Sequence, residues 1–227
     1  MKERLATIKE RIQTIAEACH RKAETVRLVA VSKTVPVEIV KEAIDAGVTI
    51  LGENYIQEAR EKCNALISYP VSWHFIGHLQ SNKAKYAVRL FDLIHSVDSL
   101  KLALEINKQA KKINRIQSIL VQVNIAREAS KSGVYVEEAT RLIEALSPLE
   151  NLAVRGLMTI PPYFDAPEKA RPFFAALREL RDQIERSAIP NIAMDELSMG
   201  MTGDFEAAIE EGATLVRIGT AIFGARK

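Results

Sequence analysis

The sequence predicts an α/β fold, a single-domain (β/α)₈ TIM barrel with an extra N-terminal helix. Short apolar, strand-like runs alternate with amphipathic stretches eight times, which is typical of a parallel sheet with helical crossovers. The chain of 227 residues is long enough to close such a barrel. The loop after the first strand reads SKTVPVE, so it lacks the GxGxxG fingerprint of the competing open, doubly wound sheet.

The first elements follow from the spacing of apolar residues. Between Leu5 and Cys19 these residues recur at intervals of three and four, with charged residues between them, which indicates a one-sided amphipathic helix. The nearly all-apolar run 28–33 is typical of a strand covered on both faces. A helix then follows Pro36 and ends at Gly47, because glycine suits a C-terminal cap.

The same alternation continues along the rest of the chain. Seven further strands are predicted in 49–54, 73–78, 93–99, 118–126, 154–160, 195–200 and 215–219. Their helices are predicted from about residue 55, in 81–90, 100–113, 136–146, 167–187 and 204–212, and in a short C-terminal segment. No domain boundary is visible, so we expect one domain over 1–227, with the helical segment in 1–27 and the barrel in 28–224.

Composition and charge exclude several classes of protein. Apolar residues make up 48% of the chain and charged residues 26%, so we expect a folded domain with a sizeable core. The 31 basic and 29 acidic residues leave a net charge of +2, which is too balanced for a protein that binds nucleic acid mainly through phosphates. No apolar run approaches the roughly 18 residues of a membrane span. We therefore expect neither nucleic acid nor a membrane as a partner.

The cysteines and histidines give no sign of a metal or disulfide framework. Cys19 and Cys63 form no CxxC pair, so we expect two buried free thiols in a reducing compartment and a cytoplasmic location. His74 and His78 are spaced i,i+4, which suggests a metal pair only on a helix, and HFIGH is predicted as strand and turn. We expect no metal site.

The first candidate functional residue is Lys33, which closes the first strand-like run. Active sites of such barrels lie at the carboxyl ends of the strands. Desolvation and nearby cations favour a neutral amine, which can attack an aldehyde to give a Schiff base. A lone lysine at a strand end more often extends into water, so Lys33 needs support from a second feature.

That feature is the pair of loops after the seventh and eighth strands. SMGMTGDF contains Ser198 and Gly200 before one predicted helix start, and RIGTAIFG contains Gly219 and Thr220 before another. Backbone N–H groups at such helix starts can face an anion, and barrels commonly build phosphate sites from these two loops. Either loop alone could be a tight turn that needs glycine. Together, on adjacent strands, they predict phosphate binding.

A lysine opposite a phosphate cradle in one barrel mouth fits pyridoxal 5′-phosphate (PLP), whose aldehyde and phosphate lie on different sides of its ring. The chain also resembles the YggS/PROSC family of pyridoxal phosphate homeostasis proteins over residues from about 28 to 224. The resemblance is carried by AVSK, LGENYIQEA, WHFIGHLQSNK, SVDS, VNIAREASKSG, RGLMTIPP, LSMGMTGDFEAAIEEGAT and VRIGTAIFG. Two positions depart from the family pattern: His78 replaces a usual proline, and Thr202 replaces a frequent serine.

The resemblance implies a barrel like the N-terminal domain of alanine racemase (PLP fold type III). It implies a covalent Schiff base on Lys33, phosphate binding by the two glycine-containing loops, and an arginine near the pyridine nitrogen. The predicted cofactor-binding residues are Lys33, Asn54, Ser198, Gly200, Arg217, Gly219 and Thr220, with His74 and Met158 added from their places at strand ends.

Arg217 bears on whether the protein is an enzyme. An arginine keeps its proton and leaves the pyridine nitrogen largely unprotonated, which argues against decarboxylation and transamination. Racemisation tolerates this, but alanine racemases take a second base from a further domain that we do not expect here. We therefore predict a non-enzymatic protein that holds PLP as a reversible Schiff base and takes part in intracellular vitamin B6 homeostasis.

Two alternatives stay open. One is a PLP-dependent amino-acid racemase or lyase of low activity, with Lys33 as base and Tyr55 or Tyr163 as a substitute second base, although tyrosines are more often structural. The other is a barrel isomerase that binds a sugar phosphate through the same loops. For the PLP protein, we expect a monomer with transient partners among PLP-dependent apo-enzymes.

Overall fold

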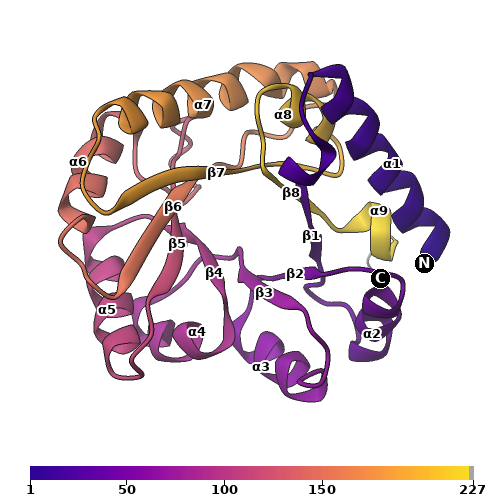
Figure 1. Cartoon of the computed structure of the whole chain (residues 1–227), viewed down its shortest axis with the longest axis horizontal. Coiled ribbons are helices and arrows are strands. Elements are labelled where there is room, and N and C mark those ends of the chain that lie inside the picture. The colour runs from indigo at the N-terminus through magenta and orange to yellow at the C-terminus, as the bar shows by residue number, and fades with distance from the viewer. Residues whose placement is uncertain (225–227) are drawn as a thin grey trace.

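A computed structural model describes residues 1–224 and shows a closed barrel of eight parallel strands with helices around it (Figure 1). The strands are β1 (Arg27–Val31), β2 (Ile50–Glu53), β3 (Ser72–Phe75), β4 (Leu93–Val97), β5 (Gln117–Gln122), β6 (Leu152–Met158), β7 (Ile192–Met201) and β8 (Leu215–Ile218). Each strand pairs with the next one along the chain, and β8 pairs with β1 to close the barrel. The predicted fold class is confirmed.

The helices follow the predicted order. They are α1 (Lys2–Ala18), α2 (Val37–Asp45), α3 (Ile56–Ala65), α4 (Ala84–Leu90), α5 (Leu100–Lys111), α6 (Val136–Leu146), α7 (Arg171–Arg186), α8 (Phe205–Glu210) and α9 (Thr220–Phe223). Single 3₁₀ turns form η1 (Ala23–Thr25), η2 (Ser81–Lys83) and η3 (Pro167–Ala170). The last two replace the first turns of the helices predicted in 81–90 and 167–187.

Helix α1 lies outside the ring of crossover helices, beside α8 and α9 (Figure 1). It buries one face through Leu5, Ile8 and Ile12, as its amphipathic spacing predicts. Its packing covers the side of the barrel where β8 meets β1. None of the helices in residues 1–224 is both long and apolar enough to cross a bilayer.

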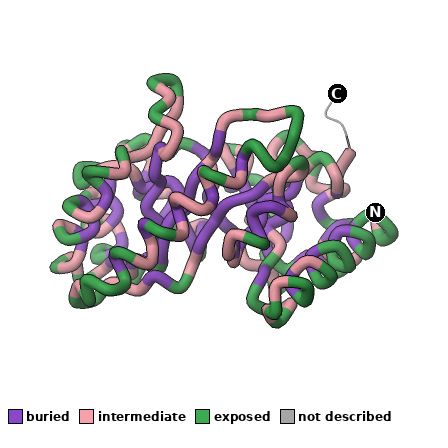
Figure 2. Tube along the Cα trace, turned by 90° about the horizontal axis from the view of Figure 1, so that it is seen from above, coloured by how far each residue is buried: buried purple, intermediate pink, exposed green. Residues whose placement is uncertain are grey.

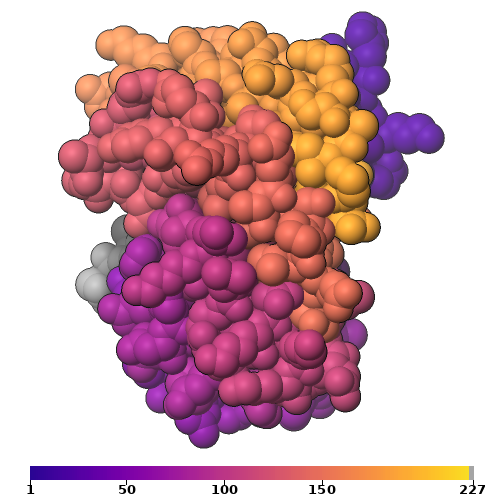
Figure 3. Space-filling view, turned by 90° about the vertical axis from the view of Figure 1, so that its left-hand side faces the viewer, coloured from indigo at the N-terminus to yellow at the C-terminus, as the bar shows by residue number. Residues whose placement is uncertain are grey.

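Two apolar layers hold the barrel together. The larger fills the space between strands and helices, and Figure 2 shows the buried residues in the middle with exposed residues along the outer helix faces. Figure 3 shows the side covered by mid-chain segments. A smaller layer inside the barrel consists of Val29, Ile50, Leu93, Leu120, Met158 and Leu215. Because side chains at i and i+2 share a strand face, His95 and Arg217 follow this inner layer toward the carboxyl ends of β4 and β8.

Two expectations need correction. The first strand ends at Val31 rather than at Lys33, so the lysine lies in the turn beyond the strand. Cys19 and Cys63 are free, but each is partly exposed and neither is a fully buried thiol.

Candidate functional site

A pocket of about 460 Å³ opens at the carboxyl ends of the strands, which is a volume typical of small-molecule and cofactor sites. The predicted residues that line it are Lys33, Asn54, Arg217, Gly219 and Thr220. The other lining residues are Val31, Ile76, Lys131, Ile160, Pro161, Pro162, Tyr163, Phe164, Pro167, Ala170, Met201, Thr202, Gly203 and Asp204. The loops after β1, β2, β3, β5, β6, β7 and β8 therefore all contribute to one site.

Lys33 reaches this pocket from a tight turn that follows β1. The turn is closed by the Val35 N–H, which donates to the Ser32 carbonyl at 3.0 Å. Thr34 adopts a left-handed backbone conformation with φ of +62°, which β-branched residues rarely adopt. Lys33 itself is half-buried. Since β1 is hydrogen-bonded to β8, the lysine and the loop after β8 come from neighbouring strands and not from opposite sides of the mouth.

The loops after β7 and β8 meet at the pocket through two threonines. The Thr220 hydroxyl donates to the Thr202 hydroxyl at 3.3 Å. Asp204 shapes the first loop, because its carboxylate accepts the Met201 N–H at 2.6 Å. The first backbone N–H groups of α8 and α9 have no acceptor within their own helices. A β-carbon built on Gly203 would meet nothing within 4 Å, so the glycine leaves open space on the pocket wall.

Ser198 and Gly200 do not line the pocket. Ser198 points into the barrel, where it contacts His95 and Arg217, and the register of β7 and β8 shifts between Ser198 and Met201. Gly200 has φ of +88°, and a β-carbon there would lie 2.6 Å from the Ala208 β-carbon. This glycine is therefore required for the close approach of β7 to α8.

Ser198 belongs instead to a buried hydrogen-bond chain that ends at Arg217. Arg217 donates to Ser198 Oγ at 2.6 Å and to the Thr159 carbonyl at 2.8 Å. Ser198 Oγ is 2.8 Å from His95 Nδ1, and His95 Nε2 is 2.9 Å from His74 Nδ1. Because arginine can only donate, the Ser198 hydroxyl is left to donate to His95, which in turn donates to His74. The chain runs in one direction with both histidines neutral.

Burial sets the charge states along this chain. Desolvation lowers the pKa of His74 to about 4 and places the pKa of His95 well below its ordinary value. Desolvation also lowers the pKa of Arg217 to about 10, so the guanidinium remains charged at neutral pH. The Arg217 guanidinium thus faces the pocket as a fixed positive charge. The groups behind it, the Ser198 hydroxyl and the two histidine rings, are neutral.

His74 and Met158 are placed behind the pocket and do not line it. His74 is the last member of the buried chain, and Met158 packs in the apolar layer inside the barrel. His74 and His78 face different surroundings, as predicted, because the His78 ring bonds the Ser132 hydroxyl at 3.1 Å. Within residues 1–224, no group of three or more His, Cys, Asp or Glu side chains is arranged to hold a metal ion.

Apart from Tyr163, sequence reasoning missed the pocket wall formed by the loop after β6. Residues 160–164 and η3 line the pocket there, and the Lys131 ammonium donates to the Pro161 carbonyl at 2.8 Å. Adjacent prolines in an otherwise strand-like and helical sequence are the signal that this loop has a fixed shape. Lys131 is a second lysine at the pocket, and its ammonium also pairs with Glu128 at 2.7 Å.

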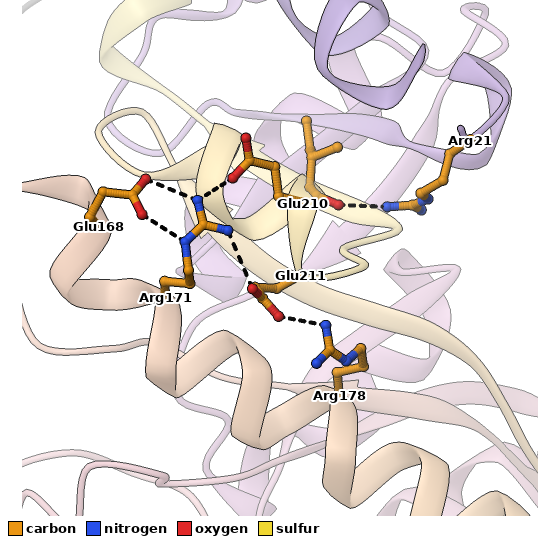
Figure 4. Close-up of polar contacts among 7 residues, drawn as sticks. Arg21, Glu168, Arg171, Arg178, Glu210 and Glu211 are labelled. Carbon is orange, nitrogen blue, oxygen red and sulfur yellow. Dashed lines mark hydrogen bonds and ion pairs between the residues drawn. The ribbon is translucent and has the colours of Figure 1, made fainter. Parts of the chain in front are cut away.

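Ion pairs join the wall after β6 to the wall after β7 (Figure 4). Arg171, the first residue of α7, contacts Glu168 in η3 at 2.7 Å, Glu211 at 3.3 Å, and Glu210 of α8. Arg178, two turns further along α7, contacts Glu211 at 2.5 Å. The carboxylates that follow the loop of β7 therefore point to α7 and away from the pocket.

The donor set fits a phosphorylated carbonyl compound. The pocket contains a lysine amine, a buried guanidinium and two threonine hydroxyls. It also contains an unused acceptor, since Asn54 Oδ1 is buried with no hydrogen-bond partner among the described residues. Such an atom needs a partner from a ligand or water. A closed (β/α)₈ barrel with this set at its mouth is typical of the class of barrels that bind phosphorylated carbonyl compounds such as PLP.

Comparisons with known proteins agree with this class. The sequence model of the family described as "Alanine racemase, N-terminal domain" matches residues 4–227. Relatives named "Pyridoxal phosphate homeostasis protein" are 49% identical in Aquifex aeolicus, over 99% of this chain and 98% of the relative, and 46% identical in Pseudomonas aeruginosa, over 99% and 95%. The chain belongs to the pyridoxal phosphate homeostasis proteins, within the family of the alanine racemase N-terminal domain.

Solved structures extend the comparison. PipY of Synechococcus elongatus PCC7942 is 35% identical in the structure described as having PLP bound, with a TM-score of 0.86 over 98% of this chain and 99% of that one. The structure of PipY without PLP gives a TM-score of 0.89 at 36% identity, over 99% and 100%. Alanine racemase of Clostridium difficile, at 18% identity and a TM-score of 0.76, covers 99% of this chain and 57% of its own length, and it shares the fold.

Proposed function

We propose that this protein binds PLP in the pocket at the barrel mouth and takes part in intracellular PLP homeostasis. The observation that carries the proposal is the meeting of a lysine, a buried arginine and two threonine loops around one volume of about 460 Å³. The names of its relatives and the PLP in one PipY structure support it.

PLP supplies an aldehyde that condenses reversibly with an amine, forming a C=N bond as water leaves. Lys33 provides the amine nitrogen, and because it is half-buried in the turn after β1, it can hold the aldehyde out of bulk solvent. Hydrolysis of the C=N bond returns the lysine amine and the aldehyde unchanged. The lysine therefore acts as a covalent but exchangeable anchor, which suits storage of a reactive aldehyde.

The remaining pocket residues hold the phosphate and the ring of PLP. The Thr202 and Thr220 hydroxyls and the backbone around Gly203 and Gly219 face the phosphate, where helix starts favour an anion. Asn54 Oδ1 offers a free acceptor to the ring substituents. Ser198 acts on the pocket through Arg217, and Gly200 lets β7 approach α8. His74 and Met158 lie inside the barrel behind the pocket.

We further propose that the protein does not turn over a substrate. Arg217 faces the pocket as a fixed cation, so it leaves the ring nitrogen without the proton that most PLP enzymes use. Tyr55 and Tyr163, the candidates for a second base, are 57% and 90% exposed. Their hydroxyls are not constrained as a catalytic base requires. We also propose that the protein is a cytoplasmic monomer that docks transiently with PLP-dependent apo-enzymes.

A visible spectrum of the purified protein, before and after borohydride, followed by mass mapping, tests the proposal. We expect one reduced adduct on Lys33 and none in Lys33→Ala. Lys131→Ala is the matched control, because Lys131 also lines the pocket and should keep the adduct. An adduct that persists in Lys33→Ala, or that maps to Lys131 in the unmodified chain, would overturn the assignment.

A further inference from the structure

A buried ionic cluster lies directly beneath the turn that presents Lys33. Lys62, on α3, is only 4% exposed, and Ser32 and Glu53 are fully buried. The Lys62 ammonium donates to the Ser32 carbonyl at 2.6 Å, to Glu53 Oε1 at 2.8 Å and to Glu58 Oε1 at 2.6 Å. The Ser32 hydroxyl also donates to Glu53 Oε1 at 2.6 Å.

The cluster holds the backbone on both sides of Lys33. On one side, Lys62 bonds the carbonyl of Ser32. On the other side, Glu58 accepts the backbone N–H of Thr34. Glu58 in turn accepts a hydrogen bond from the Lys62 ammonium. The Lys62 side chain is therefore bonded directly to the residue before Lys33 and, through Glu58, to the residue after it. The direction of the Lys33 side chain is therefore tied to α3.

The turn needs this support because its conformation is unfavourable by itself. Thr34 has φ of +62°, and a β-branched residue in that region persists only where its surroundings enforce it. Glu58 supplies the enforcing contact through the Thr34 N–H. Without the cluster, a turn of this sequence would relax to ordinary backbone angles and carry Lys33 with it.

Lys62 is also required to balance charge. Burial raises the pKa of Glu53, while the bonds from Lys62 and Ser32 oppose that rise. Glu53 Oε2 has no hydrogen-bond partner among the described residues, so Lys62 and Ser32 provide the polar contacts of this carboxylate. Removal of the ammonium leaves two carboxylates facing each other around the turn.

We propose that Lys62 is a positioning residue, which acts through Ser32, Glu58 and Thr34 to aim the Lys33 amine at the aldehyde of PLP. The proposal rests on the proposed function. Lys62 itself does not line the pocket. Its loss should therefore weaken the covalent attachment and leave the grip on the phosphate and ring intact.

Two ligands separate covalent attachment from binding of the phosphate and ring. They are PLP and 4-deoxypyridoxine 5′-phosphate, which has no aldehyde. In Lys62→Met, we expect the apparent affinity for PLP to fall tenfold or more and the borohydride-fixed adduct on Lys33 to decrease, with less than a twofold change for the analogue. Glu58→Ala should act in the same direction, and it tests the turn even if Lys62→Met does not fold. Glu61→Ala, an exposed change on the same helix, is the control and should bind both ligands normally.

Hydrogen exchange at the Thr34 amide, measured without PLP, gives an independent readout, and we expect it to accelerate in both variants. An equal loss of affinity for both ligands would mean a general structural role and would overturn the proposal. Unchanged PLP affinity in both variants would also overturn it. If the unmodified chain forms no adduct on Lys33, the proposed function fails first, so the two failures are distinguishable.

Discussion

At the scale of single residues, Arg217 shows how the barrel interior supports the pocket. Its side chain is 4% exposed, and a buried charge is tolerated only where its donors are satisfied. Ser198 Oγ and the Thr159 carbonyl accept hydrogen bonds from two of its five N–H groups. The serine therefore influences the pocket through the arginine.

Ser198→Ala should accordingly destabilise the protein. It leaves a guanidinium N–H of Arg217 and a ring nitrogen of His95 without their shared partner, which typically costs about 1–3 kcal/mol. Urea unfolding without PLP measures this loss. Ser187→Ala, which removes an exposed hydroxyl bonded to the Gln183 carbonyl, is the control and should change stability by less than about 0.5 kcal/mol. Equal stability of the two variants would contradict the buried chain.

The buried histidines also predict a pH dependence. His74 has a pKa of about 4 in the folded state and about 6.5 when unfolded. Between these values the unfolded chain binds the proton and the folded chain does not. The free energy of unfolding therefore falls as the pH is lowered through this window, by at most about 1.4 kcal/mol per pH unit for this group.

Comparison with His74→Gln isolates this effect. Burial raises the pKa values of Glu53 and Asp204, and a raised carboxyl pKa adds stability as the pH falls, but both carboxyls are present in either protein. The unmodified chain should lose more stability between pH 6.5 and 4 than the variant does. Parallel curves from denaturant titrations across this range would show that His74 is not held neutral.

At the scale of elements, strand β6 depends on one glycine. Gly156 has φ of +149°, and a β-carbon there would lie 1.9 Å from the Glu196 carbonyl oxygen of β7. The register of β6 and β7 shifts next to it, between Val154 and Gly156. The glycine therefore lets β7 approach closely where the pairing is irregular.

Gly156→Ala should lower the free energy of unfolding by at least about 2 kcal/mol, because both the backbone angle and the space are incompatible with a side chain. Gly203→Ala is the matched control, since its β-carbon would meet no atom within 4 Å, and its stability should stay within about 0.5 kcal/mol. Chemical denaturation of both variants without ligand measures the difference. A Gly156→Ala protein of normal stability would show that β6 and β7 pair differently.

The elements also show what could be predicted from the sequence. Apolar periodicity identified all eight strand and helix units, and helix α6 has its predicted bounds, because local spacing alone determines these features. The Lys33 turn could not be predicted, since the conformation of Thr34 depends on Glu58 from another element. The positions of Ser198 and Gly200 behind the pocket lining could not be predicted either, because they depend on the register of β7 against β8, which shifts between Ser198 and Met201. Apart from Tyr163, the wall after β6 was missed, because residues 160–164 carry no charged motif.

At the scale of the whole molecule, binding and stability are coupled. The pocket takes walls from seven loops spread along the chain, so a ligand there binds the folded state and not the unfolded chain. At PLP concentrations 100 times the Kd, the free energy of unfolding should rise by about 2.7 kcal/mol. We expect Tm to increase with PLP concentration, and the increase to be smaller in Lys33→Ala at the same concentration. Identical shifts for both proteins would contradict covalent anchoring by Lys33.

The closure of the barrel by β1 and β8 has a consequence for synthesis on the ribosome. The Lys33 amine is made directly after the first strand, whereas Thr202 and Thr220 follow 169 and 187 residues later. A growing polypeptide therefore carries Lys33 for most of translation without the groups that complete its site. Loading with the vitamin has to wait until the last strand has left the exit tunnel and joined the first.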